Sequence, residues 1–166
     1  MNFDTAVDAV LKREGGYVNH KNDRGGATNH GIIQANYTQW LTKHGEPWAD
    51  VKGLDADTAS QIYREDYWLP AKCELLPAAI REIHFDSAVN HGVSRAAKLL
   101  QEAAEAEPDG VIGGKTLALI GEMNVRLLKA RYMNERYRFY GKIIARDKSQ
   151  LIFIAGWMNR MREFSI

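Results

Sequence analysis

Residues 14–32 are the most informative stretch of the chain, and they read Glu-Gly-Gly-Tyr-Val-Asn-His-Lys-Asn-Asp-Arg-Gly-Gly-Ala-Thr-Asn-His-Gly-Ile. Two Gly-Gly pairs bracket a polar loop that holds one carboxylate, Asp23, and a second carboxylate, Glu14, precedes the loop. The glycine and polar character of residues 15–32 favours a small β-hairpin or loop. Enzymes that cleave sugar bonds need two carboxyl groups that face each other across the bond. We therefore expect the functional site here.

Glu14 follows a segment with the spacing of an amphipathic helix. The apolar residues of segment 2–13 recur at offsets of three and four, and they are Phe3, Val7, Val10 and Leu11. Glu14 continues this stripe, so we expect its carboxyl group at the buried edge of the helix, with Gly15 and Gly16 ending it. Lost solvation and the negative end of the helix both favour the protonated form that a general acid needs. The structural alternative is that Glu14 pairs with an arginine.

The other candidate residues of the site are polar or aromatic side chains near this stretch. Asp23 is either the second carboxylate or a turn residue that bonds its own backbone. Thr28 is either catalytic or a local hydrogen-bonding residue. An aromatic ring can stack on a sugar, and for that reason Tyr17 is favoured over the other aromatic residues, which are expected mainly in the core. The predicted substrate-binding residues are Tyr17, Asn29, His30 and Asn90.

Residues 14–32 resemble the N-terminal signature of glycoside hydrolase family 108, the phage-type N-acetylmuramidases also labelled secretion activators. The resemblance continues at residues 85–92, Phe-Asp-Ser-Ala-Val-Asn-His-Gly. Leu-Leu-Gln at 99–101 and Asp-Gly-Val-Ile-Gly-Gly-Lys-Thr at 109–116 are similar to the peptidoglycan-binding-like C-terminal half found with that family. The resemblance implies a mainly α, lysozyme-like helical domain with a small β-hairpin.

The resemblance also implies an activity, namely hydrolysis of the β-1,4 bond between N-acetylmuramic acid and N-acetylglucosamine. Glu14 matches the catalytic glutamate of the family. Eight residues separate Glu14 from Asp23, as in other phage-type lysozymes, whereas four rather than five separate Asp23 from Thr28. We therefore name Glu14, Asp23 and Thr28 as the predicted catalytic residues. Peptidoglycan glycan strands are the expected partner.

Composition is consistent with one compact protein. The chain has 166 residues and a net charge of +1, which does not favour nucleic acid as a partner. Lysines and arginines concentrate after residue 125, as either a solvated helix face or a surface attracted to the anionic wall. Cys73 is the only cysteine, and we interpret it as a structural thiol. The five histidines lack metal-ligand spacing, so no metal or cofactor is expected.

Further along the chain the pattern predicts helices and two regions. We expect a catalytic region over residues 1–93 and a peptidoglycan-binding-like helical region over 94–166, packed as one unit. Asp86 and Asn90 lie one helical turn apart, and we favour a structural role for Asp86 and a cleft role for Asn90. Ser94 is the predicted N-cap of one helix. The expected helical segments after the loop are 34–43, 55–67, 77–92, 95–106, 115–122, 125–146 and one through Phe153, Trp157 and Met161.

Two other functions remain open from the sequence. One is a non-catalytic peptidoglycan-binding or regulatory protein, and the other is a lytic transglycosylase, which uses one acid and forms an anhydro sugar. No apolar run approaches the roughly 20 residues of a membrane span, and Asp4 and Asp8 interrupt any export signal. We therefore expect synthesis in the cytoplasm without stable membrane insertion. The resemblance implies later release to the cell wall by a holin-like partner.

Overall fold

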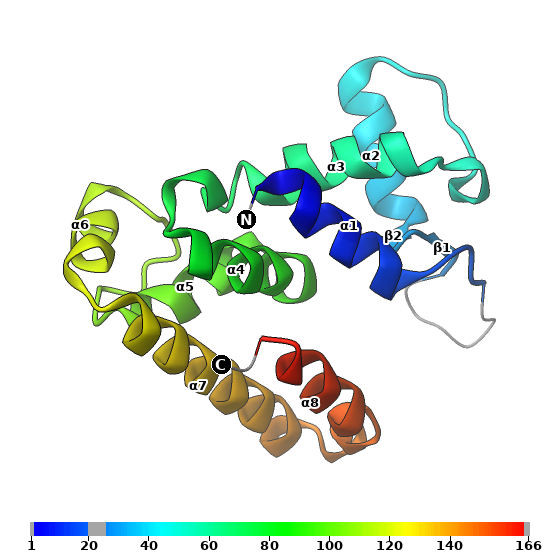
Figure 1. The fold of residues 1–166 in the computed structure, drawn as a ribbon. Helices are drawn as coiled ribbons and strands as arrows, with labels where there is room; N and C mark the ends of the chain where they lie inside the picture. Colours follow the sequence, from blue (N-terminus) through cyan, green and yellow to red (C-terminus); the bar gives the residue numbers. More distant parts are fainter. Residues whose placement is uncertain (1, 20–25, 165–166) are drawn as a thin grey trace. The chain divides into compact units, whose positions relative to one another are not determined.

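The computed structural model describes residues 2–19 and 26–164. Contacts divide the chain into two compact units, Met1–Pro70 and Ala71–Ile166. Helices make up most of both units, and the described part of the first unit adds a two-stranded antiparallel sheet (Figure 1). The predicted mainly α fold with a small hairpin is therefore confirmed. The division at residue 93 that we expected from the sequence stays a prediction.

The first unit places a small hairpin at the C-terminal end of its first helix (Figure 1). Its elements are α1 Phe3–Glu14, β1 Thr28–Asn29, β2 Ile32–Ile33, α2 Gln34–His44, η1 Val51–Gly53, α3 Ala56–Tyr63 and η2 Arg64–Trp68. The last of these is a π-helical turn that continues α3.

The first helix forms where the apolar stripe predicted it. The Asn2 side chain caps its N-terminus by accepting a hydrogen bond from the Thr5 backbone N–H at 3.0 Å, which satisfies a donor that a helix start leaves unpaired. The residues that α1 buries are Phe3, Ala6, Val7 and Val10, while Leu11 is half-buried. The ring of Phe3 meets Trp68 edge-on at 5.5 Å between centroids, so the stripe packs against the end of the α3–η2 helix.

The hairpin is tight, with a two-residue turn between its strands. Thr28 pairs with Ile33 and Asn29 with Ile32, which leaves His30 and Gly31 as the turn. Their φ angles are 51° and 76°, and positive φ at both central positions is what a type I′ turn requires. Glycine adopts this conformation without steric cost, so the His-Gly pair sets the turn.

The second unit is a bundle built around one long helix. Its elements are η3 Cys73–Leu75, α4 Ala78–His91, α5 Val93–Ala103, α6 Gly114–Glu122, α7 Val125–Arg146, η4 Lys148–Phe153 and α8 Ile154–Arg162. In Figure 1, α5 lies against α7, and α8 folds back along α7. The core includes Leu100, Leu128, Tyr132 and Met161, all with no exposed surface.

A buried ion network ties three helices of this unit together. The Asp86 carboxylate on α4 accepts hydrogen bonds from Arg136 on α7 and Arg160 on α8, each at 2.8 Å. Asp86 and Arg136 are almost fully buried, so each charge depends on the other for compensation. This network gives Asp86 a structural position within the second unit.

The α5 helix differs from its predicted limits at both ends. It begins at Val93 with Gly92 as the N-cap residue, so the prediction that Ser94 caps the helix is wrong. Gly92 takes a φ of 82° and bends the chain directly from α4 into α5, which places Ser94 inside the first turn. The helix ends at Ala103 rather than at 106, and Glu105 then adopts a left-handed φ of 56°.

The side chain of Gln101 connects α5 to the motif at residues 109–116. This side chain is 1% exposed, and its amide donates to the Asp109 carboxylate at 2.7 Å and to the Val111 carbonyl at 3.1 Å. Its oxygen accepts from the Gly110 N–H at 2.8 Å. Buried amides need such partners. The Leu-Leu-Gln and Asp-Gly-Val-Ile motifs therefore form one structural element, a loop held by a helix.

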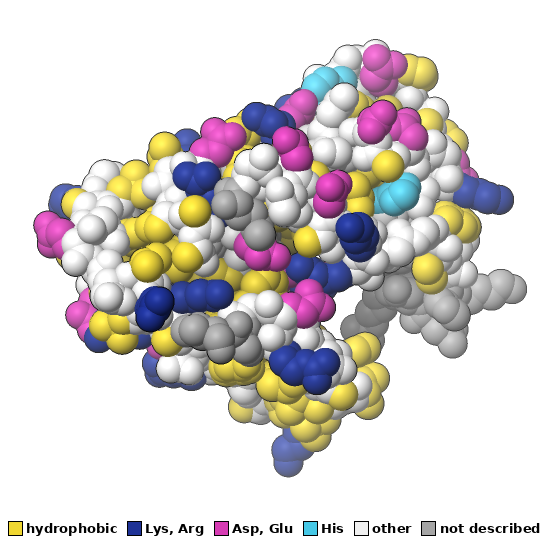
Figure 2. Space-filling view, in the orientation of Figure 1, with side chains coloured by type: hydrophobic (Ala, Val, Ile, Leu, Met, Phe, Trp, Pro, Cys, Tyr) yellow, Lys and Arg dark blue, Asp and Glu magenta, His cyan; other side chains and the backbone are white. Residues whose placement is uncertain are grey.

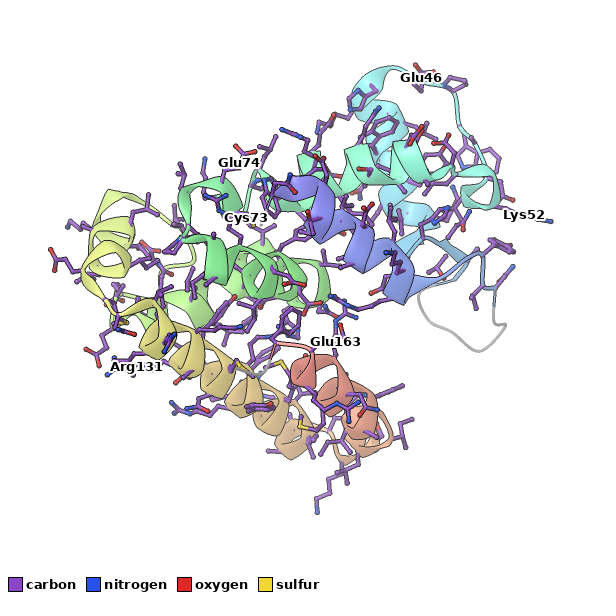
Figure 3. All side chains as sticks on the ribbon, in the orientation of Figure 1. Glu46, Lys52, Cys73, Glu74, Arg131 and Glu163 are labelled. Carbon is purple, nitrogen blue, oxygen red and sulfur yellow. The ribbon has the colours of Figure 1, made fainter. Side chains whose placement is uncertain are left out.

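Cys73 has the environment of a structural thiol. It is fully buried in η3 of the second unit (Figure 3). Burial raises the pKa of its thiol to about 12, and the thiolate is the reactive form of cysteine. This environment agrees with the interpretation made from the sequence.

His84 makes the stability of the second unit sensitive to pH. Its Nε2 donates to the Ala71 carbonyl at 3.1 Å, so the neutral ring accepts from the Tyr132 hydroxyl at Nδ1, 2.8 Å away. Burial lowers the pKa of His84 to about 4. In the unfolded chain a histidine has a pKa of about 6.5, so the unfolded state binds the proton first as the pH falls.

We therefore expect the free energy of unfolding to fall by about 3 kcal/mol through His84 as the pH drops from about 6.5 to 4. The contribution is fully present above pH 6.5. Urea titrations at pH 7 and at pH 4.5 measure it. The variant His84→Gln keeps an amide donor for Ala71 but does not titrate, so its stability should change less between the two pH values. An equal change in both proteins would contradict this assignment.

The surface of the second unit carries an exposed apolar run where α7 meets α8. Figure 2 shows hydrophobic side chains gathered at this end. The run is Leu151, Ile152, Phe153 and Ile154, of which Ile152 is 79% exposed. In the part of the chain that the structure describes, no helix has the length and apolar character to span a bilayer.

Candidate active site

Glu14 stands at the last position of α1, where the helix gives way to the hairpin segment. Gly15 ends the helix with a φ of 72°, and its N–H donates to the Leu11 carbonyl at 3.3 Å. The Glu14 side chain is half-buried. The predicted position at the buried edge of the helix end is confirmed by this geometry.

Gly31 of the hairpin turn lies directly against the Glu14 side chain. A Cβ atom added to Gly31 would stand 2.7 Å from Glu14 Cγ and 2.8 Å from Glu14 Cβ. Both distances are far shorter than the ordinary contact of about 3.5–4.0 Å between carbon atoms. Only a glycine therefore fits between the turn and Glu14, and its backbone fixes one side of the carboxyl-bearing side chain.

Tyr63, at the end of α3, completes this contact. Its ring is 1% exposed, and its hydroxyl donates a hydrogen bond to the His30 carbonyl at 2.8 Å. The same hydroxyl would stand 2.7 Å from a Cβ at Gly31. The end of α1, the hairpin turn and the end of α3 thus meet around the aliphatic carbons of Glu14. A side chain that acts in catalysis needs a fixed position, and this packing restricts the position of Glu14.

Gly31 and Tyr63 are neighbours of this site that the sequence pattern does not single out. The His-Gly pair between short apolar and polar runs is a turn signal, so the glycine could have been found as part of a hairpin. The contact of Tyr63 with a turn 32 residues earlier has no local signal, and the sequence analysis placed this tyrosine in the core.

Thr28 is part of the backbone that closes the polar loop. Its N–H and C=O exchange hydrogen bonds with Val18 at 2.9 and 2.8 Å, and its hydroxyl lies 3.4 Å from the Val18 carbonyl. The structure therefore shows Thr28 fixing the base of the segment between residues 18 and 28. Asp23 belongs to that segment and lies outside the described residues. The catalytic roles of Thr28 and Asp23 stay predictions.

The side chain of Asn29 makes its hydrogen bonds within the fold. Its side chain is 6% exposed, and its amide nitrogen lies within hydrogen-bonding distance of the carbonyls of Val51, Lys52 and Leu54, at 3.1 to 3.2 Å. These contacts fasten the hairpin to η1. The geometry favours a structural role for Asn29 over the substrate contact predicted from the sequence.

Tyr17 presents its ring at the surface of the first unit. It is 38% exposed, and the ammonium group of Lys52 lies 5.7 Å from the ring centroid. Figure 3 shows Lys52 extending outward from η1. A ring with one open face suits stacking on a sugar. Trp48 is 68% exposed, which contradicts the expectation that it lies in the core.

The remaining predicted residues contribute less to the geometry of the site. The backbone carbonyl of His30 accepts the hydrogen bond from Tyr63. The His30 side chain is half-buried, and its role in substrate binding stays a prediction. Asn90 belongs to the second unit, where it is exposed and donates to the Asp86 carbonyl of its own helix at 2.7 Å. In the described ranges, no group of three His, Cys, Asp or Glu side chains is placed to hold a metal ion.

Comparison with known proteins agrees with this arrangement. The family model described as glycosyl hydrolase 108 matches residues 7–92, and the model described as a predicted peptidoglycan domain matches residues 95–162. The structure of SagA from Brucella abortus superposes with a TM-score of 0.84 at 34% sequence identity, over 98% of this chain and 90% of SagA. The comparison with curated proteins found no match.

The two sequence signatures fall in different matched ranges. The first model contains Glu14 and the whole hairpin, and the second contains Gln101 and the loop that it holds. The chain is accordingly a glycoside hydrolase that acts on peptidoglycan. By this match over more than half of its length, the chain belongs to glycosyl hydrolase family 108.

Proposed function

We propose that this enzyme is an N-acetylmuramidase in which Glu14 is the general acid. It hydrolyses the β-1,4 bond between N-acetylmuramic acid and N-acetylglucosamine. The observation that carries the proposal is the close packing of the Glu14 side chain against Gly31 of the hairpin turn, where the Tyr63 hydroxyl also lies. This contact fixes one glutamate at the end of a helix, beside the polar loop, in the region that the glycosyl hydrolase model matches.

The role of Glu14 follows from its position. A half-buried carboxyl group on a fixed backbone can be aimed at one oxygen of a bound glycan. Its proton passes to the glycosidic oxygen as the bond to the anomeric carbon breaks, and water then attacks the sugar. The exposed ring of Tyr17, three residues after Glu14, supports a glycan alongside, because flat rings contact the apolar faces of sugars.

Product analysis tests the bond and the reaction class together. Purified peptidoglycan is digested, and the products are reduced and weighed. Muropeptides with a reducible muramic acid end are expected, because water adds to the broken bond. Anhydro muramic acid ends, lighter by one water, would instead show a lytic transglycosylase. Reducible glucosamine ends would show that the other glycosidic bond is cleaved.

We propose Asp23 as the carboxylate that stabilises the positive charge developing on the sugar. Asp23→Asn should lower kcat for peptidoglycan hydrolysis by about a hundredfold, since a neutral amide stabilises that charge far less. Asp8→Asn is the matched control, because Asp8 is exposed on α1 and its loss removes the same charge from the same unit. Near-wild-type turnover by Asp23→Asn would remove Asp23 from the mechanism.

A further inference from the structure

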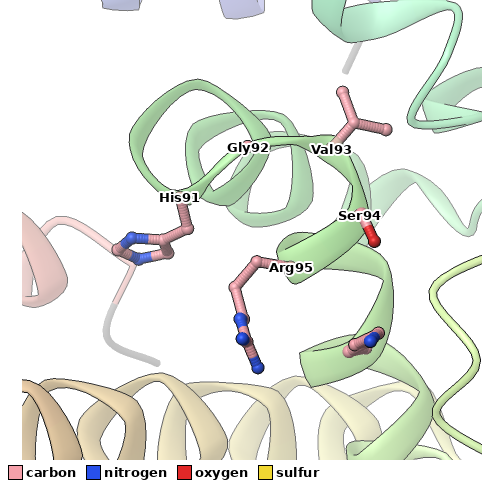
Figure 4. Close-up of a pocket in the computed structure, with 6 residues that line it drawn as sticks. His91, Gly92, Val93, Ser94 and Arg95 are labelled. Carbon is pink, nitrogen blue, oxygen red and sulfur yellow. The ribbon is translucent and has the colours of Figure 1, made fainter.

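The second unit contains a cationic hollow at the junction of α4 and α5 (Figure 4). Its volume is about 430 Å³, and its lining residues are His91, Gly92, Val93, Ser94, Arg95 and Lys98. That volume is within the range of sites that hold small ligands. The N-cap residue of α5, Gly92, offers no side-chain cap to the first turn. The first backbone N–H groups of α5 therefore lie beside the two cationic side chains.

A second, smaller hollow of about 100 Å³ continues from the first, because Arg95 lines both. It lies between α5 and α7, and α7 supplies Lys142 and Arg146, both exposed. Glu102 is the one carboxylate among the described residues that line the two hollows. Four cationic side chains and one carboxylate line the two hollows, and Asp109 adds a second negative charge near Lys98, so this surface is positive in a chain whose net charge is only +1.

Arg95 is held in place without a carboxylate partner. Its guanidinium lies 5.2 Å from the centroid of the Phe139 ring on α7, and Figure 4 shows the side chain extending from α5 toward α7. Stacking on a ring orients a guanidinium while leaving its N–H donors available. No carboxylate pairs with Arg95 among the described residues, so its donors can bind an external anion.

The loop at Gly110 packs against Ser94 and Lys98, two of the residues that line the first hollow. A Cβ at Gly110, where φ is 87°, would stand 2.6 Å from Ser94 Oγ and 3.0 Å from Lys98 Cε. Asp109 lies close enough to Lys98 for the two charges to interact. Its pKa is lowered by the hydrogen bonds from Gln101 and the Val111 N–H, and the charge of Lys98 adds to this. Because Asp109 partly offsets Lys98, Arg95 is the main anion-binding side chain of the hollow.

We propose that this hollow binds the carboxylates of the peptide stems of peptidoglycan. The glycan of an acetylated wall is nearly neutral, whereas its stem peptides carry the carboxylates, so a positive hollow selects the peptide part. Guanidinium groups bind carboxylates in a bidentate way, and neighbouring ammonium groups add to the attraction. The inference rests on peptidoglycan as the substrate of the proposed function but not on which glycosidic bond is cleaved.

Sedimentation with insoluble peptidoglycan tests the proposal. The double variant Arg95→Gln/Lys98→Gln is compared with Lys115→Gln/Arg126→Gln, which removes the same charge from exposed positions on α6 and α7. Both are made in the Glu14→Gln background so that the wall stays intact. Each protein is sedimented with intact peptidoglycan and with glycan strands from which an amidase has removed the stem peptides.

The first double variant should bind intact peptidoglycan about tenfold more weakly than its parent, the loss expected for one charge-assisted hydrogen bond. It should bind stripped glycan as its parent does, and the control should bind both as its parent does. Soluble stem peptide should displace the parent from intact wall, less effectively with an amidated stem. Equal binding of intact wall by both double variants, or an equal loss on stripped glycan, would overturn the proposal. Product analysis of the wild type would expose a failure of the muramidase assignment separately.

Discussion

Glu14→Gln is expected to lower the rate of peptidoglycan hydrolysis by about a thousandfold, within the range that general acid catalysis contributes. Glutamine has the size and shape of glutamate but carries no proton that it can give to the glycosidic oxygen. The leaving sugar alkoxide then has to depart without protonation. Release of reducing ends from purified peptidoglycan measures the rate.

The variant should keep its fold, which separates lost chemistry from lost structure. The Cβ and Cγ atoms of residue 14 pack against Gly31, and glutamine retains both atoms. We expect the urea midpoint of Glu14→Gln to stay close to that of the wild type. A folded Glu14→Gln protein with at least a tenth of the wild-type rate would show that another group donates the proton.

Gly31→Ala is expected to damage both stability and activity. Residue 31 has a φ of 76°, and an added Cβ would meet Glu14 and Tyr63 at 2.7 Å. A non-glycine residue in this conformation costs about 1–3 kcal/mol, and the clash forces the turn or Glu14 to move. Displacement of a catalytic group by about 1 Å can cost a hundredfold in rate, so we expect kcat to fall by about that factor.

Gly16→Ala is the matched control for this substitution. It adds the same methyl group two residues after Glu14, at a position with no heavy atom within 4 Å of the new Cβ. The control should retain nearly the wild-type stability and kcat. Steady-state kinetics and urea unfolding of the two variants compare them directly. Equal values for Gly31→Ala and Gly16→Ala would show that close packing at the turn does not position Glu14.

The helices could be predicted from the sequence because their signals are local. The apolar stripe from Phe3 to Val10 has the helical period, and glycines stand where α1 and α2 end. These features depend on residues a few positions apart. The α5 N-terminus was missed because Gly92 serves both as the end of α4 and as the start of α5. A serine two residues later has the usual residue type for a cap, which made it the stronger local signal.

The site could be predicted only in part. The half-buried position of Glu14 at a helix end could be predicted because its place on the apolar stripe is a local pattern. Asn29 is a predicted substrate-binding residue, and its amide contacts backbone carbonyls of η1 and of Leu54, more than twenty residues later. Contacts at that separation are set by tertiary packing and leave no periodic signal in the sequence. For the same reason, the contact between Tyr63 and the hairpin turn could not be predicted from the sequence.

The most direct test of Glu14 as the general acid compares the rate loss caused by Glu14→Gln on two substrates that differ in the leaving group. One is the natural β-1,4 glycan, whose leaving sugar needs a proton. The other is a glycan fragment with a nitrophenyl group at the scissile bond, which departs as a stable anion without protonation. We expect Glu14→Gln to lose about a thousandfold in rate on the natural glycan but less than about tenfold on the nitrophenyl substrate. An equal loss on both substrates would contradict a role for Glu14 in proton donation.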